Sequence, residues 1–329
     1  MISIERYTAD CAGEWNDFVA AAKNGTFLFN RGYMDYHADR FADHSLLYRN
    51  DKGKLIAVMP GHARDGEYFS HHGLTYGGFV SSPKLHLAEL GEIFRITAEY
   101  LREQGFTAWH YKQVPSCFHR IPSEEDSYWL WRMGAQVERC DMAQCIGLKD
   151  NAATISSNKR NRHNKLLRDG YVIQGSRSEV QGSRSEVEGA IRDFWPILEE
   201  NLMSSHQAHP VHTPEEMLLL QSRFPENIKC WTVKTPDGKV VAGTVLYLTD
   251  TTVHSQYISA SPEGKACHAI DLLFTHFIDT YRKQGQYSFF DFGTSMLPDH
   301  MHFDPGLVMQ KEEFGARGIA YREYKIELT

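Results

Sequence analysis

The sequence predicts an α+β protein of two tandem, similar domains, each with a mixed, mainly antiparallel sheet flanked by helices. The main observation is an internal repeat of two segments. KGKLIA at 52–57 returns as DGKVVA at 237–242, and YLREQG at 100–105 returns as TYRKQG at 280–285. A repeat of this length indicates a duplicated domain, because the units of solenoid proteins recur every roughly 20–50 residues.

Chain length supports the same organisation. The chain has 329 residues, about twice the length of a typical domain, so each copy can bury its own core. Hydrophobic residues make up 42% and charged residues 23% of the chain, as expected of a globular protein. We therefore predict an N-terminal domain at 1–150 and a C-terminal domain at 151–329.

Composition argues against several other classes of protein. Apolar runs are too short to span a bilayer and the N-terminus lacks the regions of a signal peptide, so we expect a cytoplasmic protein without a membrane span. The six cysteines form no C-x-x-C pair and the 17 histidines show no ligand spacing, so no metal is expected. A formal charge of -7 argues against DNA as a partner. Monomer and homodimer both remain open.

The second copy shows the pattern of elements most clearly. Alternating and β-branched apolar residues predict a meander of three strands, with a proline-glycine turn between the first two. Apolar residues at helical spacing follow a predicted loop at 261–265, and Gly285 is a helix stop signal. The predicted elements are strands at 228–234, 240–248 and 253–260, a helix at 266–283 and a strand at 287–292.

The first copy has the same order of elements, although its strands are shorter. Strands are predicted at 45–49, 55–62 and 68–69, followed by a helix at 87–104 and a strand at 108–112. Both copies therefore consist of a strand meander, a helix and a further strand.

Short motifs spread over almost the whole chain accompany this order. They are NGTFL at 24–28, YMDYH at 33–37, GLTYGG at 73–78, YKQVP at 111–115, PVHT at 210–213, RFPENI at 223–228, DFG at 291–293 and QKEEFGAR at 310–317. With these motifs the chain resembles tandem proteins of the GNAT acetyltransferase superfamily. The resemblance is to the branch related to the Fem-type aminoacyl ligases, which is associated with modification of surface polysaccharides or peptidoglycan precursors.

The resemblance implies an N-acyltransferase. Its donor would be acetyl-CoA or another acyl-CoA, and its acceptor an amine of a cell-envelope sugar or peptide precursor, such as a small molecule or a sugar nucleotide. One alternative is a Fem-like enzyme with aminoacyl-tRNA as donor, which is less favoured because no long charged helical hairpin is found. The other is a catalytically silent binding protein on the same fold.

The resemblance places the donor site in the second copy. GNAT domains bind the pyrophosphate of coenzyme A on backbone N–H groups before the central helix, where the helix dipole also favours an anion. The family pattern is Arg or Gln, two residues, Gly, one residue, then Gly or Ala; SPEGKA at 261–266 keeps the last two positions and lacks the first. An ordinary strand-to-helix turn is the alternative. The implied donor-binding residues are Tyr257, Ser261, Gly264, Lys265 and Ala266.

Three residues are candidates for the chemistry, because acyl transfer needs a positioned carbonyl and stabilisation of an oxyanion. Lys311 matches the lysine of the Lys-x-x-Phe-Gly motif that Fem-like relatives use for this purpose, with a surface lysine as the alternative. Asp291, at the end of a predicted strand, is expected to accept the amine proton or to cap the next turn. His212, before the helix start at Thr213 and Pro214, is a candidate base or a structural histidine.

Two further groups are candidates for substrate binding. The basic segment 156–168 predicts contact with a phosphate-bearing substrate through Arg160 and Arg162, or else a solvated helix face. The heptapeptide GSRSEVQ at 175–181, repeated as GSRSEVE at 182–188, indicates a loop insertion. The residues of the first copy expected on the acceptor side are Arg31, Tyr33, His37, His72 and Tyr76.

Overall fold

The computed structural model describes residues 2–149, 154–175 and 184–328. They form two compact units, Met1–Asp141 with Ala320–Thr329, and Met142–Ile319. The division falls within strand β8 and again within strand β14, so the ranges 1–150 and 151–329 expected from the sequence differ from these units at both places. The heptapeptide repeat lies largely outside the described residues.

The first unit holds a four-stranded antiparallel sheet of order β1-β2-β3-β6 and the strand series β4-β5-β7-β14. Its core is aromatic, and helix α3 contributes Phe94 next to Phe79 and Trp109. Short 3-10 turns lie at Ala9–Cys11, Phe27–Phe29, Asp35–His37 and Ser116–Phe118. The strands and helices are β1 (Ser3–Arg6), α1 (Ala12–Ala21), α2 (Arg31–Met34), β2 (Leu46–Arg49), β3 (Leu55–Met59), β4 (His62–Arg64), β5 (Glu67–Phe69), β6 (Val80–Ser81), α3 (Leu87–Glu103), β7 (Ala108–Lys112), α4 (Glu125–Arg132) and β8 (Gln136–Gly147).

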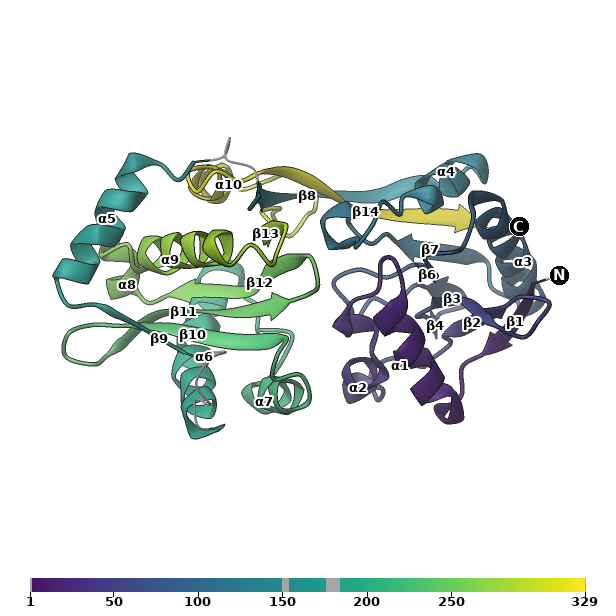
Figure 1. The fold of residues 1–329 in the computed structure, drawn as a ribbon, viewed down its shortest axis with the longest axis horizontal. Coiled ribbons are helices and arrows are strands. Elements are labelled where there is room, and N and C mark those ends of the chain that lie inside the picture. The colour runs from purple at the N-terminus through teal and green to yellow at the C-terminus, as the bar shows by residue number, and fades with distance from the viewer. Residues whose placement is uncertain (1, 150–153, 176–183, 329) are drawn as a thin grey trace. The chain divides into compact units, whose positions relative to one another are not determined.

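The second unit has the strand order β8-β13-β12-β11-β10-β9, in which only β12 and β13 run parallel. Figure 1 shows its helices around this sheet. The elements are α5 (Ser157–Arg168), β9 (Val172–Gly175), α6 (Arg184–His206), α7 (Pro214–Arg223), β10 (Ile228–Lys234), β11 (Val240–Leu248), β12 (Thr252–Ala260), α8 (Pro262–Ala266), α9 (Ala269–Gln284), β13 (Phe289–Thr294), α10 (Pro305–Glu312) and β14 (Arg317–Glu327).

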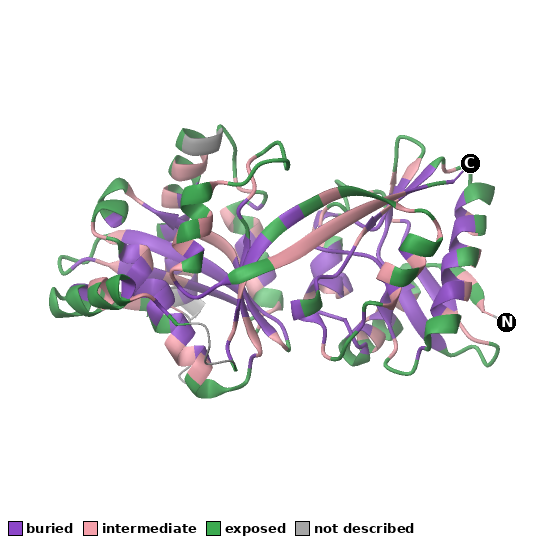
Figure 2. Cartoon of the chain, turned by 90° about the horizontal axis from the view of Figure 1, so that it is seen from above, coloured by how far each residue is buried: buried purple, intermediate pink, exposed green. Residues whose placement is uncertain are grey.

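Helices α9 and α6 cover opposite faces of this sheet. The apolar side of α9 joins the main core cluster with residues such as Leu272 and Phe277. On the other face, Phe194 of α6 lies so close to Gly243 of β11 that a Cβ there would come within 2.4 Å of its ring. The sheet is therefore buried on both sides, and Figure 2 shows buried residues concentrated in its strands and in α9.

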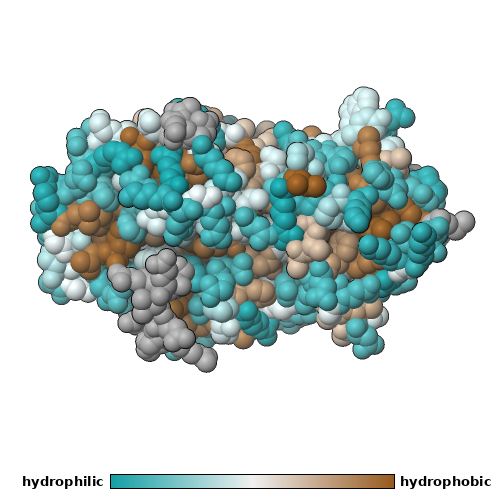
Figure 3. Space-filling model, viewed as in Figure 1, coloured by the Kyte–Doolittle hydropathy of each residue, from teal (hydrophilic) through white to brown (hydrophobic). Residues whose placement is uncertain are grey.

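The surface in Figure 3 is largely hydrophilic, with apolar side chains gathered in separate patches. Within the described ranges, no helix combines the length and the apolar character needed to cross a bilayer.

The predicted fold class is confirmed, since mixed sheets flanked by helices form both units. Strands β10 and β11 begin and end at the predicted residues. The predicted loop at 261–265 is wrong, because Ser261 caps the short helix α8 and Pro262 occupies its first position. The central helix begins at Ala269 rather than at 266, since His268 has a left-handed backbone with φ of 61°.

Candidate active site

Strands β12 and β13 are joined over only part of their length. They pair in parallel over three residues each, ending at His254 and Asp291, and no further pair follows among the described residues. β12 continues to Ala260 and β13 to Thr294, so the two strands separate beyond the last pair. The backbone edges that would otherwise pair with each other therefore border a slot in the sheet.

A pocket of ≈ 1040 Å³ lies along the separated strands, between α9 and α10. Its inner wall is aromatic, because Phe274, Phe292 and Phe314 are almost fully buried and their ring centroids lie 5.1, 5.6 and 5.9 Å apart. An apolar wall with a few polar groups is typical of ligand-binding pockets. Its polar lining includes Ser255, Gln256, Lys265, Thr294, Gln310 and Lys311.

A β-bulge in β12 lies along this wall. Val245 of β11 pairs with Tyr257 and Leu246 pairs with Ser255, so Gln256 is left without a partner residue on β11. The extra residue of a bulge withdraws its backbone groups from the ladder. The side-chain Oε1 of Gln256 is also buried without a hydrogen-bond partner. Gln256 therefore lies at the pocket wall as a bulge residue with an unpaired side-chain oxygen.

Lys311 borders the pocket from α10. The N-terminus of this helix is fixed by Asp304, whose side chain accepts the N–H of Leu307 at 2.9 Å. The Lys311 ammonium donates to the carbonyls of Gly293 and Thr294 at 2.9 and 2.8 Å. An ammonium has three donors. One N–H of Lys311 therefore remains after these two bonds.

The charge of Lys311 is sensitive to its surroundings. Burial lowers its pKa to about 8, and the carboxylates of Asp291 and Asp304 oppose this shift. The side chain is thus still mainly a cation at neutral pH, inside a pocket where water screens it poorly. A cation of this kind can stabilise a negative charge that develops on a bound carbonyl.

Asp291 lies where the two strands separate, together with a histidine that the sequence reasoning missed. His254 Nδ1 and Asp291 Oδ2 are 2.6 Å apart, and both residues are buried. Asp291 Oδ1 accepts the N–H of Gly293, which has φ of 69°. The two side chains therefore form a buried hydrogen-bonded pair at the point where the strands separate. Only the pairing of β12 with β13 brings His254 to this place, and no local motif marks it.

His212 and Tyr257 form a second pair. His212 Nδ1 lies 2.6 Å from the Tyr257 hydroxyl, and the Tyr257 ring makes an edge contact with Trp195 of α6 at 5.5 Å. Tyr257 thus lies on the α6 side of the sheet, with His212 rather than with the predicted donor loop. The helix start expected after His212 is present, because Thr213 caps α7 with Glu216.

Backbone N–H groups of the predicted donor loop form hydrogen bonds within the loop itself. Ser261 Oγ accepts the N–H of Gly264 at 3.1 Å, and the Ser261 carbonyl accepts the N–H of Lys265 at 2.8 Å. Ala266 ends the short helix. Lys265 lines the pocket and donates to the side chain of Asn201. Of this segment, Lys265 is therefore the residue with a charged group at the pocket.

Gly264 is required by packing against β11. A Cβ on Gly264 would lie 2.1 Å from the carbonyl oxygen of Val241, a backbone atom that cannot move freely. Gly264→Ala is therefore expected to lower the free energy of unfolding by about 2 kcal/mol through overpacking. Urea unfolding followed by circular dichroism measures this change.

The control for this prediction is Gly189→Ala, in helix α6. A Cβ on Gly189 would meet no atom within 4 Å, so alanine is expected to stabilise the helix by roughly 0.5–1 kcal/mol. Equal effects of the two substitutions would contradict the packing role of Gly264.

The basic segment forms helix α5 and pairs with acidic residues of α9. Lys159 Nζ lies 2.7 Å from Asp271 Oδ1, and Arg162 lies 3.0 Å from Asp271 Oδ2. Arg160 binds Asp279 through two bonds of 3.0 and 3.1 Å. Asp271 stands in the first turn of α9, where a carboxylate complements the helix dipole. Arg160 and Arg162 are thus engaged in docking α5 on the central helix.

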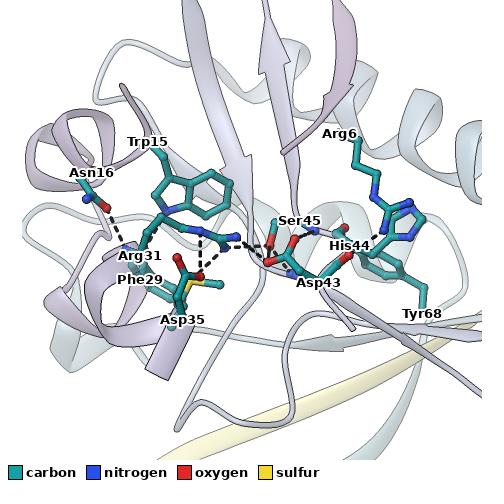
Figure 4. A network of polar contacts seen from close by, with 12 residues as sticks. Arg6, Trp15, Asn16, Phe29, Arg31, Asp35, Asp43, His44, Ser45 and Tyr68 are labelled. Atoms are coloured by element: carbon teal, nitrogen blue, oxygen red, sulfur yellow. Dashed lines mark hydrogen bonds and ion pairs between the residues drawn. The ribbon is translucent and has the colours of Figure 1, made fainter. Parts of the chain in front are cut away.

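The five residues of the first copy lie within unit 1, where Arg31, Tyr33, His37 and Tyr76 are buried and His72 is exposed. Figure 4 shows Arg31 enclosed by its partners: its guanidinium lies 2.5 Å from Asp43 and 3.4 Å from Asp35. It also lies 3.5 Å above the ring of Tyr7. The side chains of the other four make ring contacts or hydrogen bonds in the same unit; they are Tyr33 with Phe27, His37 with Phe41, His72 with Phe69, and Tyr76 with Thr26.

In the part of the chain that the structure describes, no group of three or more His, Cys, Asp or Glu side chains is arranged to hold a metal ion. Gln256 and Lys311 line the pocket, and His254 and Asp291 form the last pair of β12 and β13.

Comparison with known proteins agrees with this geometry. Residues 157–304, which include both separated strands, match the acetyltransferase (GNAT) domain family. No curated protein sequence matches the chain. The separated strands thus lie in the part of the chain that is similar to a GNAT acetyltransferase domain, and this match supports an acyltransferase.

Solved structures extend the likeness to the whole chain. FemX matches with a TM-score of 0.68 at 10% identity over 99% of this chain and 97% of that chain. The C-terminal domain of a putative lysylphosphatidylglycerol synthetase from Agrobacterium fabrum matches with a TM-score of 0.62 at 13% identity, over 97% and 92% of the two chains. A tandem GNAT protein from the clavulanic acid biosynthesis pathway matches with 0.54 at 13% identity, over 100% and 99%. The chain therefore has the tandem GNAT, Fem-like fold that its motifs predicted.

Proposed function

We propose that the protein transfers an acyl group from an acyl-CoA to the amine of a cell-envelope sugar or peptide precursor. The observation that carries this proposal is the pocket along β12 and β13, which has a buried cation and an unpaired bulge residue beside an apolar wall. Its volume of ≈ 1040 Å³ suits a long, flexible donor. Lys265 supplies a cation at the pocket for the phosphates of the donor.

The thioester carbonyl would lie between Gln256 and Lys311. When the acceptor amine attacks, the carbonyl oxygen gains negative charge, and the bulge N–H together with the remaining N–H of Lys311 would stabilise it. The apolar wall keeps water away and strengthens these interactions. Collapse of the tetrahedral intermediate breaks the carbon–sulfur bond and releases coenzyme A as the thiol.

The acceptor would approach from the α6 side of the slot. Strand alternation puts Asp291 on the side opposite to Phe292, which faces α9. Asp291 and His254 are bonded to each other, and this pair is the group that would take the proton from the amine. His212, bonded to Tyr257 on the same side, would contact the acceptor.

Two observations favour a second candidate, an enzyme with aminoacyl-tRNA as donor. In the loop at 261–266, the N–H groups of Gly264 and Lys265 donate to Ser261. The carboxylate of Asp271 already occupies the N-terminal turn of α9. A pyrophosphate would therefore be bound less strongly there than at a helix N-terminus whose N–H groups have no other partner. The cell-envelope acceptor itself is supported by the likeness to FemX and to a lysylphosphatidylglycerol synthetase.

A thermal-shift titration with acetyl-CoA tests the donor. A ligand at 100 times its Kd stabilises the folded state by about 2.7 kcal/mol, so the melting temperature should rise by several degrees. The matched control is Ile258→Trp, which fills the pocket from β12 and should abolish the shift. No shift with any acyl-CoA, together with transfer from aminoacyl-tRNA, would replace the first candidate by the second.

A further inference from the structure

We infer that the acyl group which this pocket accepts is an uncharged aliphatic chain longer than acetyl. This inference rests on the proposed function and specifies its donor. It is based on two properties of the pocket: the apolar residues of its inner wall and the positions of its ionisable residues.

The inner wall is apolar on several sides. Phe274 from α9, Phe292 from β13 and Phe314 beyond α10 converge there, and Ile258 and Ile270 also line the pocket. Phe292 follows Asp291 directly, so the apolar wall begins beside the expected position of the reacting carbonyl. A methyl group would cover little of this surface, whereas a longer chain would remove more of it from water.

The charges exclude an ammonium group on the acyl chain. Among the described residues that line the pocket, the ionisable ones are Lys265, Lys311 and Asp304. Asp304 already accepts the N–H of Leu307 as the helix cap. Asp291, the carboxylate where the strands separate, is bonded to His254 and to the N–H of Gly293. An α-ammonium next to the carbonyl would therefore lie near the Lys311 cation and lose its hydration, while both carboxylates are already engaged.

Binding of stable thioether analogues of acyl-CoA tests the inference without knowledge of the acceptor. Calorimetry with acetyl, butyryl, hexanoyl and octanoyl analogues should show affinity rising about fourfold per added methylene, which corresponds to about 0.8 kcal/mol. The affinity should stop rising once the acyl chain is long enough to reach the end of the pocket. An alanyl analogue should bind at least about tenfold more weakly than the isobutyryl analogue, which has nearly the same shape without the charge.

Variants locate the effect in this pocket. Phe274→Ala should move the preferred chain length upward by several carbons, and the milder Phe274→Leu should move it less. Phe277→Ala, on the same helix and equally buried, does not line this pocket and should leave the preference unchanged.

The outcomes separate the two proposals. Coenzyme A binding with no dependence on chain length, or a preference for the alanyl or succinyl analogue, would overturn the inference and leave the acyl-CoA donor intact. If neither coenzyme A nor any analogue binds, the acyl-CoA donor is wrong and the inference falls with it.

Discussion

Lys311→Met is expected to reduce kcat by about 10²–10³-fold, the usual cost of losing one donor to an oxyanion. The donor should still bind with nearly the same Kd, because the proposed interaction forms only in the transition state. Steady-state kinetics and a separate binding measurement give the two quantities. The variant also removes the bonds to Gly293 and Thr294, so its fold should be verified by circular dichroism.

Lys265→Met is the matched control, since Lys265 also lines the pocket but is exposed and stands at the donor loop. Its loss should weaken donor binding with little effect on kcat. If Lys311→Met raises KM and leaves kcat unchanged, Lys311 binds the substrate and does not act in the chemical step.

The pH profile adds a second signature of Lys311. Its pKa of about 8 means that the stabilising cation is lost as the pH rises through this value. The wild-type kcat/KM should therefore fall above about pH 8, and this descending limb should be absent from the residual activity of Lys311→Met. The same limb in both proteins would assign it to another group.

Lys159→Met is expected to lower the free energy of unfolding by about 3 kcal/mol, because it leaves a buried carboxylate without its main partner. Lys159 and Asp271 are only 2% exposed each, and their atoms are 2.7 Å apart. Arg162 and Glu313 complete the group around this pair. Urea unfolding monitored by tryptophan fluorescence measures the change.

The neighbouring residue provides the control for this prediction. Arg160→Met removes an ion pair with Asp279 that is open to solvent, and such pairs contribute less than about 1 kcal/mol. The double variant Lys159→Met with Asp271→Asn should regain much of the lost stability, since it no longer buries an unpaired charge. Equal losses from Lys159→Met and Arg160→Met would show that burial does not matter here.

The sequence predicts the elements of the second unit well where local patterns decide them. Strands β10 and β11 are rich in β-branched and apolar residues and flank a turn, so their ends agree with the structure. The short helix α8 is not predicted, because the sequence at 261–266 is interpreted as a ligand loop or as a strand-to-helix turn. Ser261 followed by Pro262 is a helix start signal that could have revealed it.

Parts of the candidate site depend on contacts that no local pattern encodes. His254 meets Asp291 only because β12 and β13 pair in parallel across a long connection. Likewise, the Arg160 and Arg162 side chains look free in the sequence, but α9 supplies their acidic partners more than a hundred residues later. The motif predicts a role for Lys311, whereas the hydrogen bonds of its ammonium are visible only in the structure.

The place of β14 has a consequence for how the protein is made. Residues 323–327 of this strand pair with 108–112 of β7, at the very end of the chain. On the ribosome, the N-terminal part emerges long before this strand, and β7 then has one edge of hydrogen-bonding groups without its native neighbour. Exposed strand edges invite pairing with other chains. β7 therefore lacks this neighbour until residues 323–327 have been translated, whereas residues 142–319 emerge earlier.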